Sequence, residues 1–152
     1  MDPKEFKKLY TTTIKLYSFK KKYHGYMIEL EDSTLFLDLQ RSNFGIYFDL
    51  NIRVFIEGAF DIFYKKNPDQ IKKNIGSIFM RQPVEYDKFF RLENDLTDIE
   101  RKTGLVKLFE LVILPLKDKV KTYNDILRSI NNKELKVLPP VQEELHKLVK
   151  SS

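Results

Sequence analysis

The strongest constraint on the fold is an apolar residue at every other position in two segments between Thr34 and Glu57, with mostly polar residues between them. Side chains of a β-strand point to opposite faces in turn, so this pattern predicts strands with one apolar face and one mixed face. The apolar positions of the second strand are Ile46, Phe48, Leu50, Ile52, Val54 and Ile56. The residues between them are Tyr47, Asp49, Asn51, Arg53, Phe55 and Glu57. We therefore predict a hairpin of strands 34–40 and 46–57, joined by a turn over 41–45.

Two further segments extend this hairpin into a sheet. Tyr26, Ile28 and Leu30 alternate with polar residues and predict a strand over 25–31. Residues 75–81 predict a fourth strand, which ends at Gln82-Pro83. The stretch 86–92 fits a strand and a loop equally well. These segments together predict an antiparallel sheet of about four strands in meander order.

A helix is predicted before the sheet. Asp2 suits the cap position, Pro3 the first helical position, and Glu5 follows three residues after the cap. Apolar residues at helical spacing continue this pattern to about Tyr17.

Helices are also predicted after the sheet. Thr97 and Glu100 have the spacing of a capping box, and helical spacing follows to about Ile130. We expect a kink or a new helix at Pro115, because proline has no N–H to donate. A short last helix is predicted after Pro139-Pro140. This order of elements predicts an α+β fold with the C-terminal helices packed on one face of the sheet.

Composition limits the class of protein. The length predicts a single domain over 1–152, with a compact core over about 3–130 and a peripheral helix at about 140–150. The absence of cysteine excludes disulfides, zinc–thiolate sites and cysteine nucleophiles. Because the N-terminus has no apolar secretory segment and no apolar run is long enough to span a bilayer, we expect a soluble, cytoplasmic protein without membrane contact.

Several motifs resemble one known family. Ser18 to Tyr23 reads SFKKKY, and Leu37 to Gly45 reads LDLQRSNFG. These segments resemble the "GFKKKG" and "LQKS" motifs of domain-of-unknown-function family 4304, without the flanking glycines and with Arg41 in place of lysine. The similarity covers most of residues 3–130 and is strongest over 14–57. It implies a compact bacterial α+β domain with no assigned activity, some of whose relatives look like accessory or immunity-type proteins.

Catalytic patterns are weak in this sequence. His24 and His146 lie far apart and no motif supplies either with an orienting partner, so we interpret both as structural. Asp38 and Asp49 fall on adjacent strands and on the same face, where a cross-strand salt bridge is the preferred interpretation and acid–base chemistry or cation binding the alternative. The five glycines form no phosphate-binding loop. We predict no catalytic residues, no metal site and no cofactor.

Three classes of function remain, and a protein-interaction module is preferred. The mixed sheet face combines aromatic residues and arginine with polar groups, as binding surfaces do. Its candidate binding residues are Gln40, Arg41, Tyr47, Asp49, Asn51 and Arg53. The expected partner is another protein or a second copy of this chain.

A nucleic-acid-associated basic protein is the alternative. The formal net charge is +5, and Lys20, Lys21 and Lys22 form a candidate basic patch beside tyrosines. However, only six of the 27 basic residues are arginine, the residue favoured for phosphate contacts. An enzyme is the least favoured class.

Overall fold

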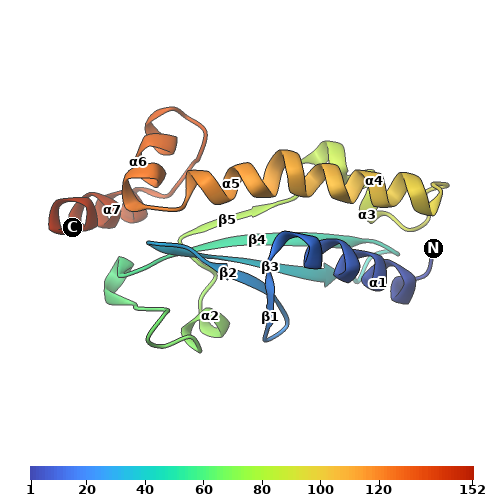
Figure 1. Ribbon diagram of the computed structural model, residues 1–152, viewed down its shortest axis with the longest axis horizontal. Helices are drawn as coiled ribbons and strands as arrows, with labels where there is room; N and C mark the ends of the chain where they lie inside the picture. Colours follow the sequence, from blue (N-terminus) through green and yellow to red (C-terminus); the bar gives the residue numbers. More distant parts are fainter.

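The computed structural model describes all 152 residues and has the predicted α+β architecture. Helix α1 (Pro3–Ile14) precedes one antiparallel sheet, and most of the other helices follow it (Figure 1). The sheet has the meander order β1-β2-β3-β4-β5. Its strands are β1 (Lys20–Lys22), β2 (Gly25–Glu29), β3 (Ser33–Arg41), β4 (Phe48–Ile56) and β5 (Ile78–Arg81). The predicted fold class is thus confirmed, with five strands in place of about four.

The additional strand is β1, at one edge of the sheet. Its three residues are lysines, all exposed, so no apolar alternation marks it in the sequence. Lys20 pairs with Met27 and Lys22 with Gly25 of β2. Short, lysine-rich edge strands discourage pairing with other chains, which gives a physical reason for this composition.

The central hairpin has the predicted register. Leu37 of β3 pairs with Ile52 of β4, and Gln40 pairs with Asp49, so the apolar and the mixed positions of the two strands share their faces. Strand β4 starts at Phe48, two residues after the predicted start at Ile46. Ile46 belongs to the turn and half of its surface is exposed (50%).

Capping residues define the predicted helix starts. The Asp2 side chain accepts a hydrogen bond from the Glu5 backbone N–H at 2.9 Å, and the Thr97 hydroxyl accepts one from the Glu100 N–H at 3.1 Å. Helix α1 ends in a 3-10 turn, η1 (Lys15–Tyr17), so the helical segment ends at Tyr17 as predicted.

Pro115 is accommodated by a widened turn. The C-terminal helices are α4 (Asp98–Leu108), the π-helical turn η4 (Phe109–Ile113), α5 (Leu114–Lys119), α6 (Tyr123–Asn131) and α7 (Pro139–Ser151). The π turn directly precedes Leu114 and Pro115, where the missing N–H of proline would interrupt a regular α-helix. The chain therefore continues through Pro115, and its next break follows Lys119.

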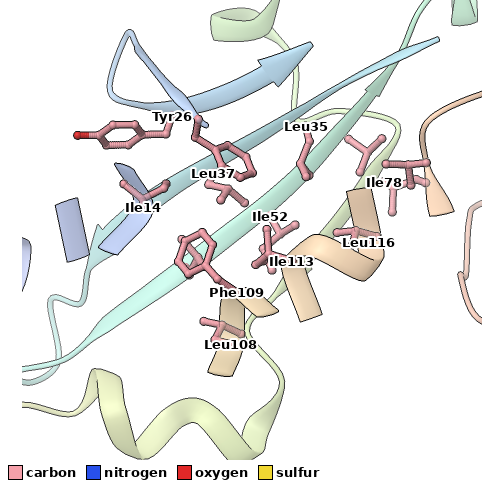
Figure 2. Close-up of a cluster of buried hydrophobic side chains, with 14 of the residues drawn as sticks. Ile14, Tyr26, Leu35, Leu37, Ile52, Ile78, Leu108, Phe109, Ile113 and Leu116 are labelled. Atoms are coloured by element: carbon pink, nitrogen blue, oxygen red, sulfur yellow. The ribbon is translucent and has the colours of Figure 1, made fainter. Parts of the chain in front are cut away.

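The main core lies between the apolar sheet face and these helices. Figure 2 shows Leu35, Leu37 and Ile52 of the sheet facing Phe109, Ile113 and Leu116. Phe6 of α1 stacks on Phe48 with ring centroids 5.1 Å apart. Val141 and Leu145 of α7 also belong to this core, so the last helix is anchored to it. No helix is both long enough and apolar enough to cross a bilayer.

A smaller layer covers part of the mixed face. Residues 62–73 form this layer, and its helix α2 (Gln70–Lys73) lies on the side of the sheet opposite α4 and α5 (Figure 1). The 3-10 turn η2 (Ala59–Asp61) leads into this layer, and its Ala59 packs in the main core. Tyr64 and Ile71 of this layer pack on Phe36 and Phe55 of the sheet.

The sequence of the stretch 86–92 fits a strand and a loop equally well. In the structure, this stretch begins at the last residue of the 3-10 turn η3 (Val84–Tyr86) and contains helix α3 (Asp87–Phe90).

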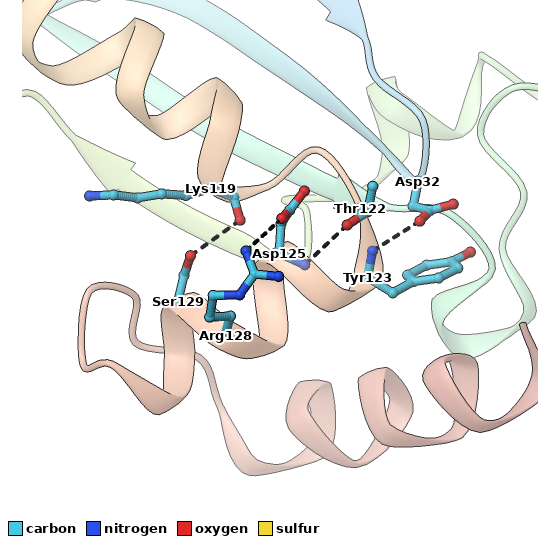
Figure 3. Close-up of polar contacts among 7 residues, drawn as sticks. All are labelled: Asp32, Lys119, Thr122, Tyr123, Asp125, Arg128 and Ser129. Carbon is cyan, nitrogen blue, oxygen red and sulfur yellow. Dashed lines mark hydrogen bonds and ion pairs between the residues drawn. The ribbon is translucent and has the colours of Figure 1, made fainter.

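Polar contacts tie the sheet to the helices at the β2–β3 turn. The Asp32 carboxylate accepts a hydrogen bond from the Tyr123 backbone N–H at 2.9 Å, and the Thr122 hydroxyl caps the same helix by accepting from the Asp125 N–H at 3.0 Å (Figure 3). The start of α6 is thereby held by its own cap and by the sheet.

Candidate functional site

The mixed face of the sheet divides into a covered part and an open part. Phe36 and Phe55 are buried at 1% and 0% exposure beneath Tyr64 and Ile71. Toward the β3–β4 turn this layer stops, and Gln40 and Arg41 are exposed. The end of this face that carries the turn is therefore accessible to a partner.

The open end forms a cavity of about 220 Å³. Four of the predicted binding residues line it: Gln40, Arg41, Tyr47 and Asp49. Phe44 from the turn and Arg81 from the end of β5 complete the wall. We call these six residues the hairpin surface.

Asn51 supports the hairpin surface from below. It is 2% exposed, and its side-chain amide donates to the Gln40 carbonyl oxygen at 3.0 Å. Its own carbonyl oxygen accepts from Arg81 Nε at 3.4 Å. Asn51 thus positions Gln40 and Arg81 and is not available to a partner.

Arg53 points to a different neighbourhood. Its guanidinium lies 3.6 Å from the Asp38 carboxylate and 5.6 Å from the centre of the Phe79 ring. Arg53 is not part of the cavity wall, so it does not converge with Arg41 on one ligand. Of the six predicted binding residues, four thus line the cavity, Asn51 supports them, and Arg53 contacts Asp38 and Phe79 instead.

Asp49 is held in place by a buried glutamine. Gln82, 7% exposed, donates from Nε2 to Asp49 at 3.2 Å and to Asp87 at 3.0 Å. Its carbonyl oxygen accepts from the Leu50 backbone N–H at 2.7 Å. The single carboxylate of the hairpin surface is therefore fixed by a neutral amide, and none of the arginines neutralises it.

Arginines concentrate on this side of the molecule. Arg41, Arg81 and Arg91 are exposed, and none of them forms an ion pair. The Arg91 guanidinium stacks on the Tyr47 ring, 4.8 Å from its centre. Of the remaining arginines, Arg101 is fully buried and Arg128 pairs with Asp125. The three exposed arginines without a carboxylate partner are thus grouped around Tyr47 and the β5 end.

The sequence reasoning missed Arg81, Arg91 and Phe44. Arg81 had a usable signal, since pairing the predicted strand 75–81 with the predicted strand 46–57 places it beside Asn51. Arg91 reaches Tyr47 through an isolated bridge between the two backbones, for which no local pattern exists. The sequence predicts Phe44 only as a turn residue. In the structure it is 94% exposed, which makes it the most exposed aromatic residue of the hairpin surface.

Strand alternation separates the three residues of the candidate basic patch. Lys20 pairs with Met27 and Lys22 with Gly25, which places these two lysines on the mixed face and Lys21 on the opposite face. The Lys22 ammonium lies over the Tyr23 ring at 5.1 Å, and the Lys72 ammonium lies over the same ring at 4.4 Å. The tyrosine beside the patch is therefore already in contact with two lysines.

The Asp38 carboxylate is paired with basic side chains of the protein itself. Asp38, 7% exposed, lies 3.4 Å from His24 Nε2 and 3.6 Å from Arg53, so the predicted cross-strand salt bridge is present for this carboxylate. In the β3–β4 ladder, Asp38 lies opposite Asn51, and Asp49 lies opposite Gln40. The two carboxylates therefore have different partners: His24 and Arg53 for Asp38, and Gln82 for Asp49. No group of three or more His, Asp or Glu side chains is arranged to hold a metal ion.

Comparison with family models, with curated proteins and with solved structures gave no match for this chain. The resemblance to family 4304 remains a prediction based on the motifs quoted above.

Proposed function

We propose that this protein is a non-enzymatic interaction module, of the accessory or immunity type, that binds an acidic surface of a partner protein through the hairpin surface. The observation that carries the proposal is the group of three exposed arginines without a carboxylate partner, Arg41, Arg81 and Arg91. A surface with this excess of positive charge is complementary to carboxylates on a partner.

The aromatic residues of the hairpin surface support the proposal that the partner is a protein. Phe44 is 94% exposed, and Tyr47 is held by the stacked Arg91. Tyrosine and arginine are enriched among the residues that dominate binding energy at protein interfaces, where they fill pockets of the partner. The cavity beside them, about 220 Å³, accepts a side chain from the other protein. The hairpin surface thus combines apolar anchors with charge that selects the partner.

Homodimerisation through this surface is disfavoured by its charge. A two-fold interface places the same patch of both copies face to face, so Arg41 and Arg81 of one copy would meet the equivalent arginines of the other. The single nearby carboxylate, Asp49, does not balance them. The partner is therefore a different, acidic protein.

The test compares captured proteins across three versions of the chain. The wild type, the double charge reversal R41E/R81E and a matched reversal outside the hairpin surface, K136E/K150E, are each immobilised and exposed to lysate of the source cell. Lys136 and Lys150 are exposed and line none of the cavities described here, so this variant controls for net charge. A protein captured by the wild type is then purified and titrated against all three versions.

The expected result is an acidic protein whose affinity falls by about tenfold or more for R41E/R81E and changes by less than about twofold for K136E/K150E. Equal affinity for all three versions would refute the proposal. Retention of a single-stranded oligonucleotide that is lost with R41E/R81E would also refute it, in favour of the nucleic-acid alternative.

A further inference from the structure

A second cavity, of about 320 Å³, lies between helix α1 and the β1–β2 hairpin. Helix α1 contributes Lys7, Tyr10 and Thr11 to its wall. The hairpin contributes Lys21 and the segment from Tyr23 to Tyr26, and Leu37 and Leu39 of β3 provide the apolar floor. It shares no residue with the cavity of the hairpin surface. Its volume is at the lower end of the range for small-molecule sites.

Tyr10 of the cavity wall carries a hydrogen-bonding group that the protein itself does not use. The residue is 4% exposed, and its hydroxyl is buried without a hydrogen-bond partner. Burial raises the pKa of this tyrosine, with smaller contributions from Tyr26 and Asp38, so the hydroxyl stays protonated and acts as a donor. A buried polar group without a partner costs free energy, and a ligand that accepts this hydrogen bond removes the cost.

The charge around the cavity is positive and uncompensated. Lys7 and Lys21 are exposed, and neither forms an ion pair. The third basic side chain of the wall, His24, is directed to Asp38 at 3.4 Å. Two lysines of the wall therefore carry a charge that no carboxylate of the protein pairs, and their flexible side chains can reach an anion as point charges.

The interior of the cavity is aromatic and aliphatic. Tyr10 and Tyr26 stand edge to face with ring centroids 6.4 Å apart. Tyr23 also lines the wall, and its hydroxyl is engaged by donation to Asp69 at 2.8 Å. Aromatic walls of this kind favour offset or edge contacts with a flat ring.

We propose that this cavity binds a small aromatic carboxylate, with its ring among the tyrosines and its carboxylate near Tyr10, Lys7 and Lys21. The two lysines supply the charge, the Tyr10 hydroxyl donates a hydrogen bond, and Leu37 and Leu39 form the apolar floor. This site is independent of the proposed binding of a protein partner.

Titration of the isotope-labelled protein with benzoate, followed by NMR, tests the site. Benzamide keeps the ring and removes the charge, whereas cyclohexanecarboxylate keeps the charge and removes the flat ring. We expect benzoate to shift the amide signals of α1 and the β1–β2 hairpin in a saturable way, and the two analogues to bind at least about threefold more weakly.

Two variants and a control locate the contacts. K21Q removes an exposed charge without touching the core, and Y10F removes only the hydroxyl; each should weaken benzoate binding by about threefold or more. K4Q, on the same helix but outside the cavity wall, should leave the affinity within about twofold. Because Y10F removes a buried hydroxyl that has no partner, this variant should be no less stable than the wild type.

Three outcomes would overturn the inference. Benzoate that causes no saturable shift shows that the cavity is not a site for such anions. Equal binding of benzoate and benzamide removes the role of charge, and unchanged affinity in both K21Q and Y10F places the anion elsewhere on the protein.

Discussion

The two faces of the sheet differ in how they are covered and in what they leave free. The apolar face belongs to a core of 26 buried residues, covered by α1 and the C-terminal helices. The mixed face has a buried cluster of only four residues, beneath the segment that contains η2 and α2. Beyond this cluster it carries arginines and exposed aromatic residues. One face therefore buries most of the core, and the other leaves arginine and aromatic side chains accessible.

The largest effect is expected from Phe109→Ala in the helix-covered core. Phe109 is fully buried, stacks on Tyr17 at 5.0 Å and contacts Phe19 at 6.3 Å between ring centroids. Removal of its ring leaves a cavity that the surrounding helices cannot close, and we expect a loss of about 3–5 kcal/mol in the free energy of unfolding. Urea denaturation measures this loss. A loss below about 1 kcal/mol would show that this core is not the main source of stability.

Arg101→Met is expected to rank second, with a loss of about 2–4 kcal/mol. The buried guanidinium donates to the backbone carbonyls of Phe89 at 2.7 Å, Arg91 at 3.2 Å and Asn94 at 3.2 Å. The variant leaves these carbonyls without their donor and loosens the segment that carries Arg91. Hydrogen exchange of residues 89–94 should accelerate more than exchange in the β3–β4 ladder. Equal acceleration in both regions would contradict this local role.

Phe36→Ala makes the same substitution in the small cluster of the mixed face. Phe36 is 1% exposed and packs with Phe55, Tyr64 and Ile71. Because the covering layer is thin, it can relax into the space, and we expect a loss of about 2–3 kcal/mol, below that of Phe109→Ala. Urea denaturation of both variants under the same conditions gives the comparison. A larger loss for Phe36→Ala would reverse the assignment of the two faces.

A pH-dependent contribution to the free energy of unfolding is expected at the contact between α7 and η2. The Glu144 carboxylate of α7 accepts from the Phe60 backbone N–H of η2 at 2.6 Å and pairs with Lys147 at 3.1 Å. These contacts lower the pKa of Glu144 in the folded state, the Phe60 hydrogen bond having the larger effect. Because the folded pKa is depressed, this contribution is present above the ordinary glutamate pKa and is lost as the pH falls through the folded value.

Unfolding of the wild type and of Glu144→Gln as a function of pH tests this contribution. Between about pH 6 and about pH 3 the wild type should lose more stability than the variant. Parallel pH profiles of the two proteins would show that Glu144 makes no such contribution.

The smallest effect on stability is expected from Phe44→Ala on the hairpin surface. Since Phe44 is 94% exposed, its removal should change the free energy of unfolding by less than about 0.5 kcal/mol. The same variant should bind the captured acidic protein at least about tenfold more weakly. Isothermal titration and urea denaturation measure the two quantities. A large loss of stability would show that Phe44 packs within the protein.

Local chemistry allowed the sheet and the helix starts to be predicted. The alternation through β3 and β4 determines their faces, because a shift of one residue would expose the whole apolar set. Asp2 and Thr97 define helix starts, because their side chains satisfy backbone N–H groups a few residues away. The apolar stripe of the C-terminal segment indicates that its helices pack on one face of the sheet. All of these features depend on residues close together in the sequence.

Tertiary structure alone decided the extent and composition of the candidate site. The three lysines of β1 carry no apolar pattern that would predict a strand. Strand β1 forms because β2 offers it a free edge for backbone pairing. The covering of Phe36 by Tyr64 and Ile71, and the approach of Arg81 and Arg91 to Tyr47, join residues that are far apart in the chain. Such contacts depend on how loops and strand ends pack in three dimensions. Local sequence patterns therefore predict the central strands and their two faces, whereas packing in three dimensions adds β1 and leaves one part of the mixed face open.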